Sequence, residues 1–490
     1  MIDREEHRLW QDIVRLTDQS DSEIVRSIRI ALLFSLSFPT NDPSWRLVAR
    51  LIKNCRSLLP MRKIRVALQE GGVVIFVVDD SALILRHLLP VAREANRRGI
   101  LRGVVSLVDL PSMKEFGDRV PIITAKTLLS NLTFKDKVKI VTDASRVFKE
   151  VSGLLAQSEA TYARRFRKNS VVILDHIITS LQMAKAFQLL HQTWRPSCVV
   201  VPSDLWPPHY QFSYQASVLK IPSISLQHGV SDFFWWPFVS DLCCVWGEAF
   251  ADEMRQFGAP SERLAVVGLP STDGIFQHAK TMEQTRDMGN REPVCLFLSQ
   301  THGAKYEPEI FAKYRQFIIE VTKLMPRIKW KVKLHPMEDD SFYRELGKEV
   351  FDRLTFHPKD ISLEDAVTDA DVVSTTYSTA GLEAMIMDRP LIVAPAIPRV
   401  RQFSWWPEKG GGTYGDSAED FQSQLTKLVS DRGYLTKQLE QQRGFLAKSF
   451  AHPGHAAEKV VDLLESLSHT QVSASARGVT REEVYSEGQA

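Results

Sequence analysis

Residues 371–393 read DVVSTTYSTAGLEAMIMDRPLIV and predict a buried strand, a turn, a helix and a second buried strand. The turn consists of short polar side chains and leads into the helix through Ser378, Thr379 and Gly381. A helix start presents unpaired N–H groups and a partial positive charge, which favour a phosphate group. Glu383 follows one turn later, where a carboxylate can reach a ribose hydroxyl. The segment therefore predicts a nucleotide-phosphate site at the carboxyl edge of a parallel sheet, or an ordinary strand–helix–strand unit with a Ser/Thr cap.

The same alternation of strands and helices extends over most of the chain. Continuous apolar runs such as residues 73–78 and 294–298 are followed by helical patterns, which predicts βαβ units and parallel sheets. Residues 270–292 are polar and separate two such series, so we interpret them as a linker. Because 490 residues exceed one ordinary core, we expect an α/β protein with two Rossmann-like, doubly wound domains that face each other across a cleft.

The predicted parts follow one another along the chain. They are a helical leader over residues 1–65, a first domain over 66–270, a second domain over 271–450, a C-terminal helix over 451–470 and a disordered tail over 471–490. The stretch from about residue 108 to 192 is predicted to be helical.

Composition excludes several classes of protein. With 61 basic and 59 acidic residues, the net charge of +2 gives no basis for nucleic-acid binding by the whole surface. Five cysteines without a CxxC pair indicate free thiols in a reducing compartment rather than disulfides or a zinc site. The charged start MIDREE is unlike a secretory signal, and no run approaches about 20 uncharged apolar residues. We therefore expect a cytoplasmic protein, with peripheral contact to the inner face of a membrane left open.

Polar residues follow several predicted strands of the first half. His228, in Gln227-His228-Gly229, can act as a general base toward an acceptor hydroxyl, bind a phosphate, or simply cap a loop. Asp80 and Asp204 also follow strands, where each can supply a carboxylate base or serve a structural role such as N-capping. Because open α/β sheets bind ligands at the carboxyl ends of their strands, His228, Asp204 and Asp80 are our candidates for catalysis.

The second half carries a similar set. Lys333 and His335 lie in Lys333-Leu334-His335-Pro336, where proline fixes the turn and holds the imidazole for contact with a phosphate oxygen. His302 follows the first strand of this half and can also contact a phosphate. The candidate residues for the nucleotide donor are His335, Ser378, Thr379, Gly381, Glu383, Lys333 and His302.

Two aromatic clusters, at residues 233–237 and 403–407, come shortly after candidate segments. Each can stack a sugar or a base, but packing in a core or an interface is the simpler interpretation. Three glycines at 410–412 are typical of a mobile loop or lid.

Five motifs occur in an order that resembles the GT-B superfamily of nucleotide-sugar glycosyltransferases. They are QHG at 227–229, VWGE at 245–248, VGLP at 267–270, KLHP at 333–336 and STAGLEA at 378–384. The resemblance covers about residues 70–450 and is closest to capsule-type sugar transferases (Kdo or sialic acid) and CDP-glycerol glycerophosphotransferases.

The resemblance implies that the second domain binds the nucleotide donor and the first binds the acceptor. By this likeness His335 contacts the donor phosphate, the Ser378-Thr379 pair also holds it, and Glu383 takes the ribose. His228 matches a candidate base. The chain departs from these families in having Gln before His-Gly and Ser-Thr in place of paired serines.

GT-B enzymes as a class need no bound metal, so the resemblance implies neither a metal nor a cofactor, and the nucleotide sugar is a substrate. The helix dipole, His335, and Lys333 or Arg401 would neutralise the phosphate instead. The implied reaction is an inverting transfer of a sugar to a hydroxyl of a surface polysaccharide or glycolipid. The alternatives are a CDP-glycerol-type glycerophosphotransferase, a sugar-nucleotide 2-epimerase, and a non-catalytic GT-B scaffold.

Overall fold

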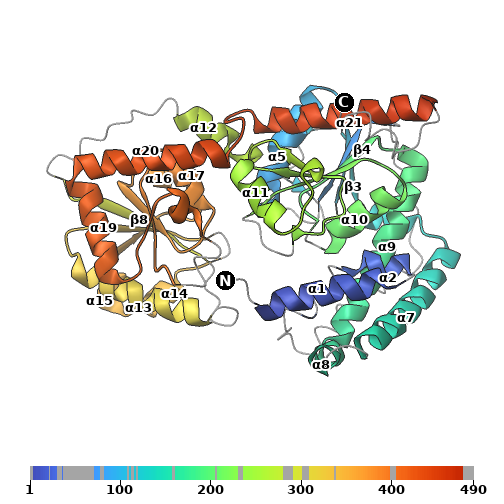
Figure 1. Ribbon diagram of the computed structural model, residues 1–490, viewed down its shortest axis with the longest axis horizontal. Helices are drawn as coiled ribbons and strands as arrows, with labels where there is room; N and C mark the ends of the chain where they lie inside the picture. The colour runs from blue at the N-terminus through green and yellow to red at the C-terminus, as the bar shows by residue number, and fades with distance from the viewer. Residues whose placement is uncertain are drawn as a thin grey trace. The chain divides into compact units, whose positions relative to one another are not determined.

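The protein is described by a computed structural model. The described residues are 4–20, 22–29, 32, 36, 71–77, 82–106, 110–111, 115–116, 120–156, 160–204, 207–229, 235–279, 291–300, 308–335, 338–397 and 404–477. They form two compact units, each built around one sheet (Figure 1). Of the described residues, those within 4–246, Phe250–Pro270 and 455–477 belong to the first unit, whereas Gly247–Ala249 belong with those within Ser271–Gly454 to the second.

The first unit contains a seven-stranded sheet in the order β3-β2-β1-β4-β5-β6-β7, in which all pairings are parallel. The strands are β1 (Val73–Val77), β2 (Leu101–Ser106), β3 (Ile122–Thr124), β4 (Cys198–Val201), β5 (Ser223–Leu226), β6 (Leu242–Val245) and β7 (Leu264–Val266). The residues of β4 and β5 are all buried, as expected of strands covered on both faces.

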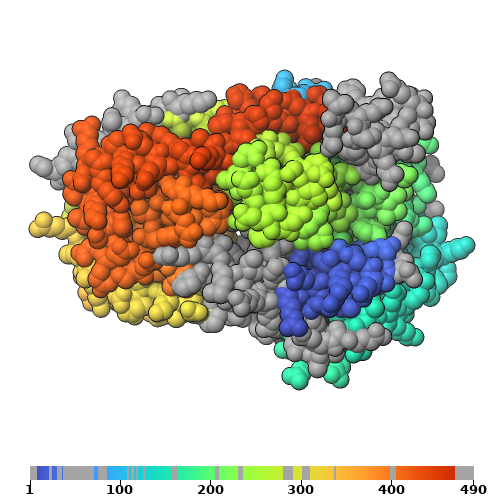
Figure 2. Space-filling view, viewed as in Figure 1, coloured from blue at the N-terminus to red at the C-terminus, as the bar shows by residue number. Residues whose placement is uncertain are grey.

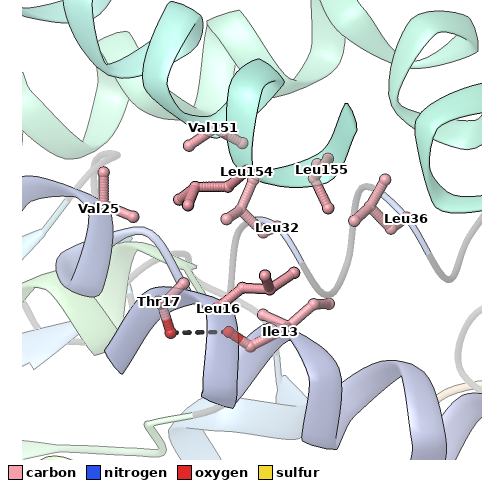
Figure 3. Close-up of a pocket in the computed structure, with 9 residues that line it drawn as sticks. All are labelled: Ile13, Leu16, Thr17, Val25, Leu32, Leu36, Val151, Leu154 and Leu155. Atoms are coloured by element: carbon pink, nitrogen blue, oxygen red, sulfur yellow. Dashed lines mark hydrogen bonds between the residues drawn. The ribbon is translucent and has the colours of Figure 1, made fainter. Parts of the chain in front are cut away.

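Helices surround this sheet. They are α1 (Arg4–Asp18), α2 (Glu23–Ser27), α5 (Ala82–Arg97), α6 (Ala125–Ser130), α7 (Phe134–Ala156), α8 (Ala160–Lys168), α9 (Ser170–Trp194), α10 (Pro207–Val218), α11 (Glu248–Gln256) and α21 (Ala456–Arg477). Figure 3 shows Val151 and Leu155 of α7 directed toward Ile13 and Leu16 of α1. The space among them is about 10 Å³ and lined almost wholly by apolar side chains, so it is a packing defect and not a ligand site.

The C-terminal helix α21 packs on the first unit although it follows the second unit in sequence. Val460, Val461 and Leu464 lie in the same apolar cluster as β1 and α5. Arg98, just after α5, donates hydrogen bonds to Asp462 at 2.7 Å and to Glu465 at 2.9 Å. The last helix is therefore attached by both apolar burial and an ion-pair cluster.

The second unit contains a six-stranded parallel sheet in the order β10-β9-β8-β11-β12-β13. Its strands are β8 (Val294–Leu298), β9 (Lys329–Lys333), β10 (Leu354–Phe356), β11 (Val372–Thr375), β12 (Leu391–Val393) and β13 (Thr413–Tyr414). Its helices are α12 (Asp273–Ala279), α13 (Pro308–Leu324), α14 (Ser341–Arg344), α15 (Lys348–Phe351), α16 (Leu363–Thr368), α17 (Ala380–Ile386), α19 (Ala418–Ser430) and α20 (Arg432–Ser449). At the centre of the core, the rings of Phe297 and Trp330 stack 5.0 Å apart.

The two doubly wound α/β sheets confirm the predicted fold class. Three local predictions are wrong. Residues 273–279 form α12 within the predicted linker, and residues 122–124 form β3 within the stretch predicted to be helical. The predicted tail begins too early, because α21 continues through residues 471–477.

Candidate functional site

Each sheet reverses its strand order beside its first strand. The reversal lies between β1 and β4 in the first unit and between β8 and β11 in the second. At such a point the loops that leave the neighbouring strands run in opposite directions, and ligands of open α/β sheets bind in the resulting crevice at the carboxyl ends. Residues placed at these two strand edges are therefore the candidates for function.

In the second unit, a buried network joins the carboxyl ends of β8 and β9. Ser299, directly after β8, donates from Oγ to Glu338 Oε2 at 2.6 Å. Tyr343 donates from its hydroxyl to Ser299 Oγ at 2.7 Å. Glu338 Oε2 also lies 3.4 Å from the backbone N of His335. The network fixes the turn that carries His335, and Glu338 is a member that the sequence did not indicate.

Burial governs the charge state of this turn. It raises the pKa of Glu338 to about 7, against the hydrogen bonds from Ser299 and from the backbone of His335. Burial also lowers the pKa of Lys333 and of His335, and the charge of Lys333 lowers that of His335 further. A lysine and an imidazole that are both partly desolvated favour an anion between them, because its charge would stabilise their protonated forms.

The turn after β11 is held by hydroxyl groups of its own residues. Ser378 donates from its backbone N to Thr375 Oγ1 at 3.2 Å, and Ser378 Oγ accepts from Ala380 N at 3.2 Å. Thr375 Oγ1 in turn donates to Leu298 O at 3.3 Å, which ties the turn to the end of β8. Thr379 precedes α17 without capping it by its side chain. The hydroxyls thus shape the turn at the same edge as the β8–β9 network.

The two other candidates, Gly381 and Glu383, lie on α17. A Cβ on Gly381 would approach Thr375 Cγ2 to 3.0 Å and the Leu391 side chain to 3.2 Å, so glycine lets α17 lie close to β11 and β12. Glu383 is buried in α17. The close packing of α17 on β11 and β12 therefore explains the glycine at position 381 without any ligand.

In the first unit, three histidines lie near the reversal point. His228 follows β5 and its ring stacks on Trp235 at 5.1 Å, while burial lowers its pKa to about 4. His87 on α5 and His209 on α10 are fully buried, and among the described residues the ring nitrogens of His209 have no hydrogen-bond partner. Burial lowers the pKa of both well below the usual value, and interaction with His228 lowers both further. The three imidazoles are therefore neutral at pH 7 and close enough to interact electrostatically.

Gln227 fixes the loop that carries His228. Its Oε1 accepts from Trp246 N at 3.0 Å and its Nε2 donates to Gly229 O at 2.9 Å. The indole of Trp246 also donates to Gln227 O at 2.8 Å. The side chain must accept and donate at once, which explains an amide at this position.

Solved structures provide a comparison for the fold. The glycosyltransferase from Rickettsia africae ESF-5 matches with a TM-score of 0.51 and 11% identity, over 81% of this chain and 98% of that one. The UDP-GlcNAc 2-epimerase from Neisseria meningitidis bound to UDP-GlcNAc matches with a TM-score of 0.50 and 14% identity, over 81% and 100%. S. aureus MnaA with UDP matches with a TM-score of 0.50 and 12% identity, over 80% and 95%. The protein has the GT-B fold. No protein-family model and no curated protein matches the sequence.

Within this GT-B fold, Asp204 is a structural residue, contrary to its predicted role as a catalytic base. It is buried after β4, and its carboxylate accepts four hydrogen bonds, from Ser213 Oγ, Val239 N, Ser240 N and Ser240 Oγ. Burial raises its pKa, which these hydrogen bonds oppose. A carboxylate so engaged holds the segment before β6 in place, with three of these hydrogen bonds on Oδ2 and one on Oδ1.

Two predicted site residues, Asp80 and His302, lie outside the described residues, as does Arg401. In the part of the chain that is described, no group of three or more His, Cys, Asp or Glu residues has an arrangement that could hold a metal ion. The described helices include none that is long and apolar enough to cross a membrane.

The described parts of both aromatic clusters pack inside the GT-B units. Trp235 and Phe238 are buried in a cluster with β6 and α11. Trp406 is fully buried, and a Cβ on Gly411 would approach the ring of Phe445 to 2.8 Å. Gly410 and Gly411 are therefore packed against α20 and Gly412 against β12, while the interpretation of this segment as a mobile loop or lid stays a prediction.

Proposed function

We propose that the protein is an inverting, metal-independent glycosyltransferase. It moves a sugar from a nucleotide-activated donor to a hydroxyl of a surface polysaccharide or glycolipid. The observation that carries the proposal is the convergence of Ser299, His335 and the 375–378 turn on the reversal point of the second sheet. Proteins of similar fold have been solved with UDP and with UDP-GlcNAc, which supports a nucleotide sugar as the class of ligand.

The donor phosphates bind at the carboxyl edge of the second sheet. Lys333 supplies positive charge that burial has made costly to keep without an anion, and His335, whose pKa burial lowers, takes up a proton when the donor phosphate binds beside it. Hydroxyl and backbone groups of Ser378 and Thr379 contribute hydrogen bonds, and Glu383 selects the ribose. The same cations stabilise the charge that develops on the leaving nucleotide.

The acceptor is activated in the first unit. The acceptor oxygen forms a bond to the anomeric carbon while the bond from that carbon to the phosphate oxygen breaks. The acceptor proton passes to the neutral imidazole of His228, and the bonding electrons leave with the nucleotide. Gln227 keeps His228 in place for this step through its bonds to Trp246 and Gly229.

A sugar-nucleotide 2-epimerase is the second candidate, because UDP-GlcNAc 2-epimerases are among the structures with this fold. An epimerase converts a sugar nucleotide with no acceptor present, whereas a transferase needs one. A glycerophosphotransferase requires CDP-glycerol as the donor. A scaffold without catalysis binds no nucleotide.

The proposal is tested in two stages. A thermal-shift screen with CMP, CDP, UDP, GDP and their sugars identifies the nucleotide, since a bound ligand raises the melting temperature. NMR then follows the matching sugar nucleotide with and without a polysaccharide or glycolipid extract. Release of nucleotide only with acceptor supports the transferase, conversion without acceptor supports the epimerase, and no shift with any nucleotide contradicts both.

A further inference from the structure

The solvent side of α7 carries an apolar stripe. Phe134, Val138 and Val141 are 81%, 46% and 49% exposed, and their i, i+4, i+7 spacing places them on one line along the helix. Another side of α7, about 100° around the helix from this stripe, is buried, with Val151 and Leu155 directed toward α1 (Figure 3). The packing of the unit thus fixes α7 with this stripe outward.

A basic stripe runs beside the apolar one. Lys135, Lys139, Arg146 and Lys149 are exposed, and they recur at positions i, i+4, i+11 and i+14. The stripe begins one residue after the apolar stripe, so the two lie about 100° apart around the helix.

The acidic residues of this part of α7 are turned inward. Asp143 pairs with Lys139 at 2.8 Å and with Arg146 at 3.1 Å; its side chain is 15% exposed, whereas those of its two partners are 69% and 65% exposed. Asp136 pairs with Lys185 of α9 at 3.1 Å. The outer surface of α7 therefore presents apolar and positively charged groups, with its carboxylates withdrawn.

Helix α8 extends the positive charge. It packs beside α7 through the rings of Phe148 and Phe166, which lie 5.1 Å apart. Arg164, Arg167 and Lys168 are exposed on α8, which contains no acidic residue. Residues 134–168 hold nine basic and four acidic residues, a net charge of +5, although the whole chain has only +2. Figure 2 shows atoms of α7 and α8, in cyan to green, at the surface of the first unit.

We propose that this face of α7 and α8 docks on an anionic membrane surface. Negatively charged lipid headgroups complement the basic groups, and Phe134, Val138 and Val141 enter the boundary between headgroups and acyl chains. Helices that lie in this boundary combine an apolar stripe with Lys and Arg at its margin, and juxtaposed basic residues are attracted to anionic leaflets. A soluble polyanion would need the basic stripe but would give the exposed phenyl ring no partner.

The proposal does not depend on the assigned reaction. It concerns a surface on helices α7 and α8, and it involves none of the residues placed in the donor or acceptor sites. It would hold the unit that carries His228 at a membrane, where a glycolipid is found.

The test is co-sedimentation of the full chain with vesicles of phosphatidylcholine alone or with about 30% phosphatidylglycerol. We expect binding only to the anionic vesicles, weakened by raising the salt concentration. Phe134→Ser combined with Val138→Ser should lower the partition coefficient about tenfold, from the apolar area no longer buried in the membrane. The double variant Lys135→Glu and Lys149→Glu should lower the partition coefficient more than the apolar double variant does, because two attractions to the membrane become repulsions.

Matched controls lie on α13 of the second unit. Leu324→Ser removes a side chain that is 40% exposed, and Lys313→Glu reverses an exposed charge. Both should bind vesicles like the unmodified protein. Nucleotide-induced thermal shifts should be equal in all variants, which separates this test from that of the reaction.

Two results would overturn the proposal. One is that the unmodified protein fails to bind anionic vesicles at low salt. This result contradicts the proposal even if heparin, a soluble polyanion, retains the protein. The other is unchanged vesicle binding by the Phe134 and Val138 double variant, which would leave charge alone as the cause.

Discussion

Glu338 Oε2 accepts a hydrogen bond from Ser299 Oγ at 2.6 Å and thereby links the carboxyl ends of β8 and β9. The same carboxylate oxygen faces the backbone N of His335 at 3.4 Å. A single half-buried side chain thus links two neighbouring strand ends at the point where the sheet reverses its order. The proposed phosphate site depends on this link, since it fixes the turn from which His335 projects.

Glu338→Gln should make stability less sensitive to pH. Burial raises the pKa of Glu338 from its usual 4.5 to about 7, so the folded protein binds this proton more tightly than the unfolded chain does. The stabilising contribution is complete below pH 4.5 and is lost as pH rises through 7. Glutamine keeps an acceptor for Ser299 and does not ionise. In urea unfolding at pH 5, 6, 7 and 8, the variant should gain stability relative to the unmodified protein as pH rises, whereas a constant difference would refute the assignment.

Gln227→Ala should impair transfer without changing nucleotide affinity. The substitution leaves Trp246 N without its side-chain acceptor and frees the His228 loop from Gly229 O. Loss of a buried hydrogen-bond partner costs about 1–3 kcal/mol. The expected result is a fall in kcat/KM of about tenfold or more with an unchanged dissociation constant for the nucleotide.

Gln227→Glu serves as the matched control for that variant. Its carboxylate can still accept from Trp246 N but cannot donate to Gly229 O, so it removes only half of the arrangement. The kcat/KM of Gln227→Glu should lie between those of the unmodified protein and Gln227→Ala. Full activity in both variants would show that the loop needs no support from residue 227.

Arg98→Ala should loosen the C-terminal helix. Arg98 bonds to Glu94 at 2.7 Å, to Asp462 at 2.7 Å and to Glu465 at 2.9 Å, so it joins α5 to α21. We expect a loss of about 1–2 kcal/mol in the free energy of unfolding and faster tryptic cleavage within α21. The neighbouring Arg97→Ala is the control, because Arg97 is 69% exposed and bonds to Glu94 of its own helix. Equal cleavage of both variants would mean that apolar packing alone holds α21.

The sequence predicts the sheets well where burial leaves a continuous apolar run, as in β4 and β8. It misses β3 and β13, because strands of three and two residues have no measurable periodicity. The position of His335 shortly after a strand is predicted correctly. Glu338, His87 and His209 could not be predicted as site residues, because the residues that surround them are distant in sequence. Asp204 is misassigned for the same reason: Val239 and Ser240, which bind it, lie 35 and 36 residues away.

Calorimetric titration of the folded protein, His335→Ala and His357→Ala with CMP, CDP, UDP and GDP tests the central claim most directly. His357 is also followed by proline, but it follows the edge strand β10, away from the reversal point. The account predicts that one nucleotide binds the unmodified protein and His357→Ala equally, and binds His335→Ala about tenfold or more weakly because a charge-assisted hydrogen bond is lost. Equal affinity in His335→Ala, or no nucleotide binding by the folded protein, would contradict it.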